Sequence, residues 1–299
     1  MPNLAERLRD GAPVVLDGGL GTLLEQNGQD VSGKLWASHL IVDEPDAVRQ
    51  AHREFFAAGA EVATTASYQA SFEGLDMAGI GRGALTGILR QAVRLAREAA
   101  SEFDGDRYVA ASVGPYGAML ADGSEFHGNY GKSVAELTRW HRARLDAYAE
   151  AGADLLAIET IPSLAEAEAI VQALAGTGLQ AWVSISARLG ASPSGEPLRE
   201  AYQVLAESDE VVALGINCSP PSEVLGAIQA AHLVSDKPIV VYPNSGEEWD
   251  VKRKQWIHHR TFTESVVQQW FQAGAAAVGG CCRVLPDEIQ HVTELVRQL

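Results

Sequence analysis

The chain alternates short apolar runs with longer amphipathic segments, and it does so eight times. Most of the short runs are almost continuously apolar, which is typical of parallel strands that are buried on both faces. We therefore expect eight strands, at residues 14–18, 61–67, 108–115, 154–160, 181–187, 211–218, 238–243 and 276–282.

The segments between the strands have helical periodicity, at residues 45–58, 84–101, 133–151, 163–174, 198–207, 222–232 and 262–273, with a last helix at 286–298. Ser163 is followed three residues later by Glu166, and this spacing predicts a capping box. Gly59, Gly152 and Gly274 each stand in the phrase Ala-Gly-Ala, directly after a helix and before a strand. We expect these glycines to be C-terminal helix caps.

Eight strand-helix units in 299 residues predict a single (β/α)8 barrel that covers residues 1–299. The competing fold is an open, doubly wound sheet, which the glycine-rich turn at residues 18–22 would favour. We expect no helix after that turn at the spacing of a dinucleotide-binding fold, so the barrel is preferred. No linker or low-complexity segment divides the chain, which indicates one domain.

Charge and cysteine content exclude several classes of function. The formal net charge is −16 and the basic residues are scattered, which argues against binding to nucleic acid or an anionic membrane. The first eleven residues lack a signal-peptide core, and no apolar run approaches the ~20 residues of a membrane span. Three cysteines are too few for a disulfide-stapled secreted fold. We therefore expect a cytoplasmic protein with reduced thiols.

In a barrel, the loops that follow the strands lie on one face, where active sites are built. Three of these loops are long, at residues 19–44, 116–132 and 245–261. Polar residues at the ends of the strands should meet on the same face, namely Asp17, Ser67, Glu159, Ser186, Asn217, Cys218, Asn244, Cys281 and Cys282.

All three cysteines of the chain end predicted strands. Cys218 ends the sixth, and Cys281 and Cys282 end the eighth after two glycines. With strands ~4.8 Å apart, the two groups start ~10 Å apart, and side chains that lean over the barrel mouth can share one ion. Three thiolates with one open position are typical of a catalytic zinc site. The alternatives are three buried free cysteines or a vicinal disulfide.

A zinc ion with three thiolates suits one chemistry in particular. Such a site lowers the pKa of an incoming thiol but leaves the bound sulfur nucleophilic. Alkylation of a thiol is therefore favoured, and hydrolysis is the second choice. Asn244 is a candidate for the open metal position at rest, whereas His258 and His259 are weaker metal candidates in a charged loop.

Two acids at strand ends, Asp17 and Glu159, suit the binding of an ammonium group, although either acid could instead cap a loop. The backbone amides of residues 18–20 could receive a carboxylate. Aromatic residues of the long loops either bind a cationic ligand or anchor the loops, namely Trp36, Tyr116, Tyr130 and Trp249.

On these motifs the sequence resembles the homocysteine S-methyltransferases along nearly its whole length. The motifs are Asp17-Gly18-Gly19, Gly215-Ile216-Asn217-Cys218 and Gly279-Gly280-Cys281-Cys282-Arg283. The segments 66–70, 112–116 with 120–124, and 241–247 resemble the S-methylmethionine-dependent members. The length of 299 residues leaves no room for the folate and cobalamin domains of the cobalamin-dependent methionine synthases.

The resemblance implies a (β/α)8 barrel with zinc on Cys218, Cys281 and Cys282, which serve as metal ligands and catalytic residues. The zinc-bound thiolate of L-homocysteine would take a methyl group from S-methylmethionine or S-adenosylmethionine, in methionine biosynthesis. Asp17 and Glu159 would hold the ammonium group. Further expected substrate contacts are Gly18, Gly19, Ser186 and Asn244.

Two other classes of function stay open at this point. A zinc-dependent hydrolase or lyase could use the same barrel and the same three cysteines. A non-catalytic thiol sensor could oxidise Cys281 and Cys282 reversibly. The sequence leaves the preferred methyl donor and the oligomeric state open.

Overall fold

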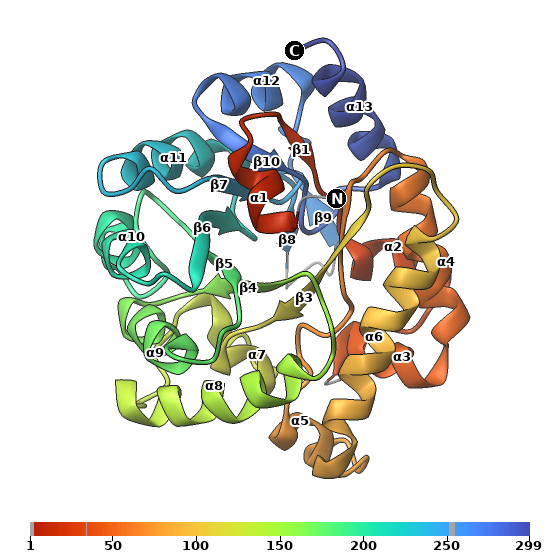
Figure 1. Ribbon diagram of the computed structural model, residues 1–299, viewed down its shortest axis with the longest axis vertical. Coiled ribbons are helices and arrows are strands. Elements are labelled where there is room, and N and C mark those ends of the chain that lie inside the picture. The colour runs from red at the N-terminus through yellow and green to blue at the C-terminus, as the bar shows by residue number, and fades with distance from the viewer. Residues whose placement is uncertain (1–2, 34, 251–254) are drawn as a thin grey trace.

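Eight parallel strands form one sheet in the computed structural model, which describes residues 3–33, 35–250 and 255–299 (Figure 1). The order of the strands is β1-β10-β7-β6-β5-β4-β3-β2, and a parallel bridge between Leu16 and Val62 joins β1 to β2. The sheet therefore curls into a barrel, as predicted, and the open doubly wound sheet is excluded. The strands are β1 (Val14–Val15), β2 (Val62–Thr64), β3 (Tyr108–Val113), β4 (Leu155–Ile161), β5 (Ala181–Ile185), β6 (Val211–Asn217), β7 (Ile239–Tyr242) and β10 (Ala275–Val278).

Helices surround the sheet on its outer side (Figure 1). Those that the periodicity predicted are α4 (Pro45–Ala57), α6 (Leu85–Ala100), α8 (Val134–Ala149), α9 (Leu164–Leu174), α10 (Leu198–Ala206), α11 (Val224–His232), α12 (Glu264–Gln272) and α13 (Pro286–Val296). Their apolar faces and one face of the strands form a large outer core. The other face of the strands forms a second core, so side chains fill the barrel interior. None of the helices in the described residues is long and apolar enough to cross a membrane.

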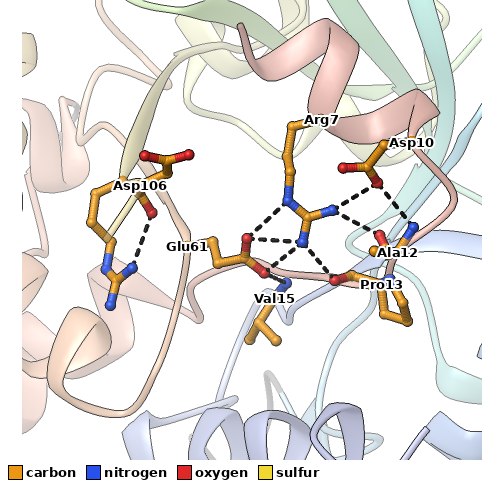
Figure 2. A network of polar contacts seen from close by, with 8 residues as sticks. Arg7, Asp10, Ala12, Pro13, Val15, Glu61 and Asp106 are labelled. Atoms are coloured by element: carbon orange, nitrogen blue, oxygen red, sulfur yellow. Dashed lines mark hydrogen bonds and ion pairs between the residues drawn. The ribbon is translucent and has the colours of Figure 1, made fainter. Parts of the chain in front are cut away.

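A short N-terminal helix, α1 (Leu4–Arg9), was not predicted. Its buried residues Leu4, Ala5 and Leu8 join the inner core, so α1 closes the end of the barrel where the strands begin. Figure 2 shows the polar contacts that connect Arg7 of α1 to neighbouring residues. Arg7 donates to both carboxylate oxygens of Glu61 at 2.9–3.1 Å and to the carbonyl oxygens of Ala12 and Pro13 at 2.9 Å.

The long loops at the opposite end contain structure of their own. The first holds α2 (Leu20–Gln26), η1 (Trp36–His39) and α3 (Leu40–Asp43). We expected no such helix after the glycine turn, but Leu20, Leu23 and Leu24 give α2 a buried face at helical spacing. The other connections contain α5 (Phe72–Met77), η2 (Arg82–Ala84), α7 (Tyr116–Leu120), η3 (Ser124–Phe126), η4 (Pro221–Glu223) and the hairpin of β8 (Glu248–Asp250) and β9 (Gln255–Ile257).

The predicted caps are borne out in part. Ser163 accepts the amide of Glu166 at 3.2 Å, as a cap should. The carboxylate of Glu166 does not close the predicted box, because it accepts the amide of Tyr116 at 2.6 Å and lies 2.9 Å from His141 Nε2. Gly59 has a φ of +101°, as expected of a C-terminal cap, and a Cβ there would lie 2.4 Å from the side chain of Thr293.

Candidate active site

The three cysteine side chains meet at the carboxyl ends of the strands, with all sulfur atoms within 4.8 Å of one another. Cys218 directly follows β6 with a left-handed φ of +49°, which turns the chain at that residue. Cys281 and Cys282 follow β10 after Gly279 and Gly280, and their sulfur atoms lie 3.9 Å apart. All three thiols are free, so the vicinal disulfide is absent here.

The spacing of the sulfur atoms fits one tetrahedral metal ion. Zn–S bonds of about 2.3 Å in tetrahedral geometry place the sulfur atoms about 3.8 Å apart, close to the 3.9 Å between Cys281 and Cys282. Thiolates are soft ligands, which suit zinc better than magnesium or calcium. The cysteines also line a cavity, so a fourth position would face that cavity. The three cysteines therefore could hold one metal ion.

The thiols do not ionise equally. Hydrogen bonds from Cys218 and then Cys281 hold the pKa of Cys282 well below its ordinary value. The pKa of Cys281 is raised well above its ordinary value, because its thiol bonds to Cys218 and Cys282 and burial disfavours a second charge. The first proton is therefore lost at Cys282, and a bound cation would be needed to ionise the whole cluster.

Glu159 lies on a distorted part of β4. The pairing of β4 with β5 shifts register between Ile158 and Ile161, and Thr160 has a φ of +62°, which strains a β-branched residue. Asn217 stabilises this bulge, because its Oδ1 accepts Thr160 N at 2.7 Å and its Nδ2 donates to Thr160 Oγ1 at 2.8 Å and Glu159 Oε2 at 3.2 Å. The bulge helps direct the carboxylate of Glu159 to the cavity that the cysteines line.

The surroundings of Glu159 favour the protonated form of its carboxyl group. Burial, followed by the charges of Asp17 and Cys282, raises its pKa to about 7, although a hydrogen bond from Ser112 opposes this rise. An ammonium group beside Glu159 would favour the ionised form instead. Glu159 is thus suited to a cationic ligand close to the cysteines.

Asp17 lies behind the cavity wall rather than among the residues that line it. It is fully buried, and it accepts Thr64 N at 2.7 Å and Thr64 Oγ1 at 3.1 Å. The Tyr242 hydroxyl lies 2.7 Å from both Asp17 Oδ1 and Gly18 O, two acceptors for a single proton. A protonated Asp17 would donate to the Tyr242 hydroxyl, which would then donate to Gly18 O. Burial raises the pKa of Asp17 to about 7, which favours this protonated form. Its contact with a substrate ammonium group stays a prediction.

The glycine turn packs against the cysteine turn. A Cβ at Gly19 would lie 2.4 Å from Cys281 O, and one at Gly18 would lie 2.5 Å from Val284 O. The amide of Gly19 already donates to Val284 O at 2.8 Å, so it is not available to a substrate carboxylate. The amides of Gly18 and Leu20 remain candidates for that contact.

Two predicted substrate contacts lie beside the cavity and do not line it. Asn244 Oδ1 accepts the amide of Cys282 at 3.2 Å, which supports the cysteine turn and directs this oxygen to the backbone. Ser186 is buried at the end of β5, and its amide donates to Ile161 O. Substrate contact by either residue stays a prediction.

The cavity above the cysteines has a volume of about 460 Å³, within the usual range for a small-molecule site. Of the described residues that line it, none is Lys, Arg or His, and two are acids, Glu125 and Glu159. This composition favours a cationic ligand. Sequence reasoning missed Glu125, because a glutamate in a loop carries no signal of its own.

The aromatic residues of the loops divide into two groups. Trp36 lines the cavity, and a Cβ at Gly21 would lie 2.2 Å from its ring. Tyr116 packs on Tyr130 and Trp140 with ring centroids 5.3 and 5.1 Å apart, so these tyrosines anchor the loop. The side chain of Trp249 lies outside the described residues. His258 and His259 are exposed and do not belong to the cysteine group.

Comparison with known proteins gives consistent matches. The family model for "Homocysteine S-methyltransferase" matches residues 14–296. The chain is 41% identical to homocysteine S-methyltransferase YbgG of Bacillus subtilis, over 99% of both chains, and 41% identical to the homocysteine S-methyltransferase of Escherichia coli, over 92% of this chain and 93% of that one. Its structure is similar to the metallated form of the homocysteine methyltransferase MmuM from Escherichia coli, with a TM-score of 0.86, 37% identity and coverage of 97% and 99%. The oxidised form of MmuM matches with the same TM-score and identity, over 98% of this chain and 99% of that one.

Proposed function

Because this chain belongs to the homocysteine S-methyltransferase family and is a methyltransferase, we propose that it methylates homocysteine at a zinc site formed by Cys218, Cys281 and Cys282, with S-methylmethionine as the donor. The observation that carries the proposal is the group of three sulfur atoms within 4.8 Å of one another at an acidic cavity. A reducing compartment such as the cytoplasm would keep these thiols free for the metal.

Zinc fits the three cysteines by donor type and by spacing. With three thiolate ligands the site carries a net charge of −1 and keeps one position open to the cavity. Zinc bound there would lower the pKa of an incoming thiol and leave the ionised sulfur nucleophilic.

The protein's own residues orient homocysteine. Glu159 would hold the ammonium group, because its carboxylate lines the cavity near the cysteines and is fixed by Ser112 and Asn217. A bound ammonium group would favour the ionised form of Asp17, which would then add negative charge from behind the wall. The amides of Gly18 and Leu20 would receive the carboxylate of the substrate.

Methyl transfer then needs alignment more than acid-base catalysis. The thiolate sulfur of homocysteine attacks the methyl carbon in line with the bond to the donor sulfur. That bond breaks, and its electron pair returns to the donor sulfur, which leaves as a neutral thioether. With S-methylmethionine both products are methionine. No proton is delivered to the leaving group, which agrees with the absence of Lys, Arg and His among the described lining residues.

A donor panel tests the proposal. Zinc-loaded, reduced protein is given homocysteine and one donor at a time, and methionine formed per zinc is measured. We expect S-methylmethionine to react fastest, S-adenosylmethionine more slowly, and betaine and methyl-folate not at all. A chelator should abolish the reaction and zinc should restore it. Turnover with betaine or methyl-folate but with neither sulfonium would refute the donor assignment, and metal-dependent release of ammonia without a thiol would favour a hydrolase or lyase.

A further inference from the structure

We propose that Glu125 is a specificity-determining residue that binds the ammonium group of the methyl donor. This inference rests on the proposed function and extends it to the second substrate. The reaction brings two amino acids into one cavity, and each of them carries an ammonium group. The cavity offers two glutamates among its described lining residues, and Glu159 is beside the cysteines where homocysteine must react.

Glu125 has a carboxylate oxygen without a partner. Its Oε2 atom is buried from solvent and accepts no hydrogen bond, although the residue lines the cavity. No ion pair of a described residue involves Glu125, and the charged neighbours that influence it are Asp122 and His127, both exposed in the same loop. Burial raises the pKa of Glu125, which a bound cation would reverse. A buried acceptor that faces a cavity is a site for a donor group of a ligand.

The position of Glu125 is fixed by its loop rather than by its side chain. The residue lies in η3, and the amide of Ser124 donates to Asp122 Oδ1 at 3.0 Å at the start of that turn. Gly117 of α7 packs closely on the backbone of this turn, since a Cβ there would lie 2.4 Å from Glu125 N. The carboxylate is therefore presented by a supported backbone, and its Oε2 atom has no protein partner.

Gln69 supplies a second acceptor to the same part of the cavity. Its Nε2 donates to Ala118 O at 3.3 Å, next to the glycine that packs on Glu125, and its Oε1 is buried without a partner. Gln69 also lines the cavity. A primary ammonium group has three N–H donors, so it can donate hydrogen bonds to both Glu125 and Gln69. A quaternary ammonium group such as that of betaine has no N–H donor.

Glu125 lies on a different side of the cavity from Glu159. The carboxylate of Glu159 bonds to Ser112 of β3 and Asn217 of β6 at the strand ends, whereas Glu125 lies in η3, in the loop that follows β3. Tyr68 also lines the cavity, and beyond the effect of burial it is close enough to Cys218, Glu125 and Glu159 for their charges to raise its pKa. Homocysteine bound through its sulfur at the cysteines would leave the loop side, with Glu125, to the donor.

The test compares Glu125→Gln with the unaltered, zinc-loaded enzyme. The donors are S-methylmethionine and its analogue without the amino group, (3-carboxypropyl)dimethylsulfonium. We expect Glu125→Gln to lower kcat/KM for S-methylmethionine by about ten- to a hundredfold, the usual weight of a charge-assisted hydrogen bond, with the KM of homocysteine and the zinc content unchanged. The analogue should react slowly with both proteins and at the same rate. Glu200→Gln is the matched control, because it removes an exposed carboxylate of α10 that does not line the cavity, and it should match the unaltered enzyme.

The outcomes separate this inference from the proposed function. If the unaltered enzyme turned over neither S-methylmethionine nor S-adenosylmethionine, both the proposed function and this inference would be overturned. Turnover by the unaltered enzyme combined with an unchanged Glu125→Gln variant would overturn the inference alone. An equal loss with both donors would also overturn it, because a merely structural role would not distinguish them. The comparison of the two donors in the unaltered enzyme needs no variant, and a preference below threefold for S-methylmethionine would refute the inference.

Discussion

Replacement of Asp17 by asparagine should change how the stability of the metal-free protein depends on pH. Burial raises the pKa of Asp17 from 3.8 to about 7, so the folded state keeps a proton that the unfolded state releases. The free energy of unfolding therefore falls as pH rises from the unfolded pKa through the folded one, by at most about 1.4 kcal/mol per pH unit for this group. Across the whole window the loss is about 4 kcal/mol.

Asparagine keeps the shape and removes the titration. Its oxygen can accept Thr64 N, and its amide group can donate to the Tyr242 hydroxyl, which then donates to Gly18 O, as with a protonated Asp17. The variant should match the original protein near pH 3, below both pKa values, and become more stable by about 4 kcal/mol near pH 8. The charge of Asp17 also raises the pKa of Glu159, so the remaining pH dependence should shrink as well.

The assay is urea unfolding at half-unit pH steps, with a chelator and a reductant present. Fluorescence and circular dichroism should give coincident transitions, which is the condition for a single free energy of unfolding. Asp46→Asn, on the exposed side of α4, controls for the loss of one charge. A difference between Asp17→Asn and the original protein that stays constant with pH would refute a proton on Asp17.

Three further substitutions test other parts of the structure. Cys218→Ser should lower zinc content from one ion per chain and abolish methyl transfer, because three thiols share the ion; full occupancy and activity by metal analysis and assay would contradict the site. Glu159→Gln should raise the KM of homocysteine about tenfold or more while zinc stays bound, and unchanged kinetics would assign Glu159 to the fold. Arg7→Met should lower the melting temperature by a few degrees through the lost bonds to Glu61 and two carbonyl oxygens, with kcat and KM unaffected; an unaltered melting curve would show that these bonds do not stabilise the fold.

The convergence of the cysteines could be predicted because it depends only on topology. Parallel strands of a barrel end on one face, so residues that end strands β6 and β10 must meet there whatever the details of the loops. The helices and the strand order followed from hydrophobic periodicity in the same way. Periodicity failed at α1 and α2, since helices of 6 and 7 residues are too short for a clear pattern.

Side-chain roles that depend on distant contacts could not be predicted. The bulge at Glu159 and Thr160 contains neither glycine nor proline, and the residue that stabilises it, Asn217, lies 58 positions from Glu159. Glu166 carried a local capping signal, but the amide of Tyr116 and the ring of His141 took its carboxylate instead. Asp17 looked like a residue at the open rim, and only the positions of Thr64 and Tyr242 show that it lies behind the wall.

The short helix α1 has a consequence for the order of events in catalysis. Because Leu4, Ala5 and Leu8 fill the barrel where its strands begin, ligands enter and leave from the face where the strands end. In the proposed binding mode, the molecule on the cysteines would therefore arrive before the one under the loops and would depart after it. Initial-velocity plots should intersect for the two substrates, and a donor bound too early should appear as substrate inhibition that homocysteine relieves.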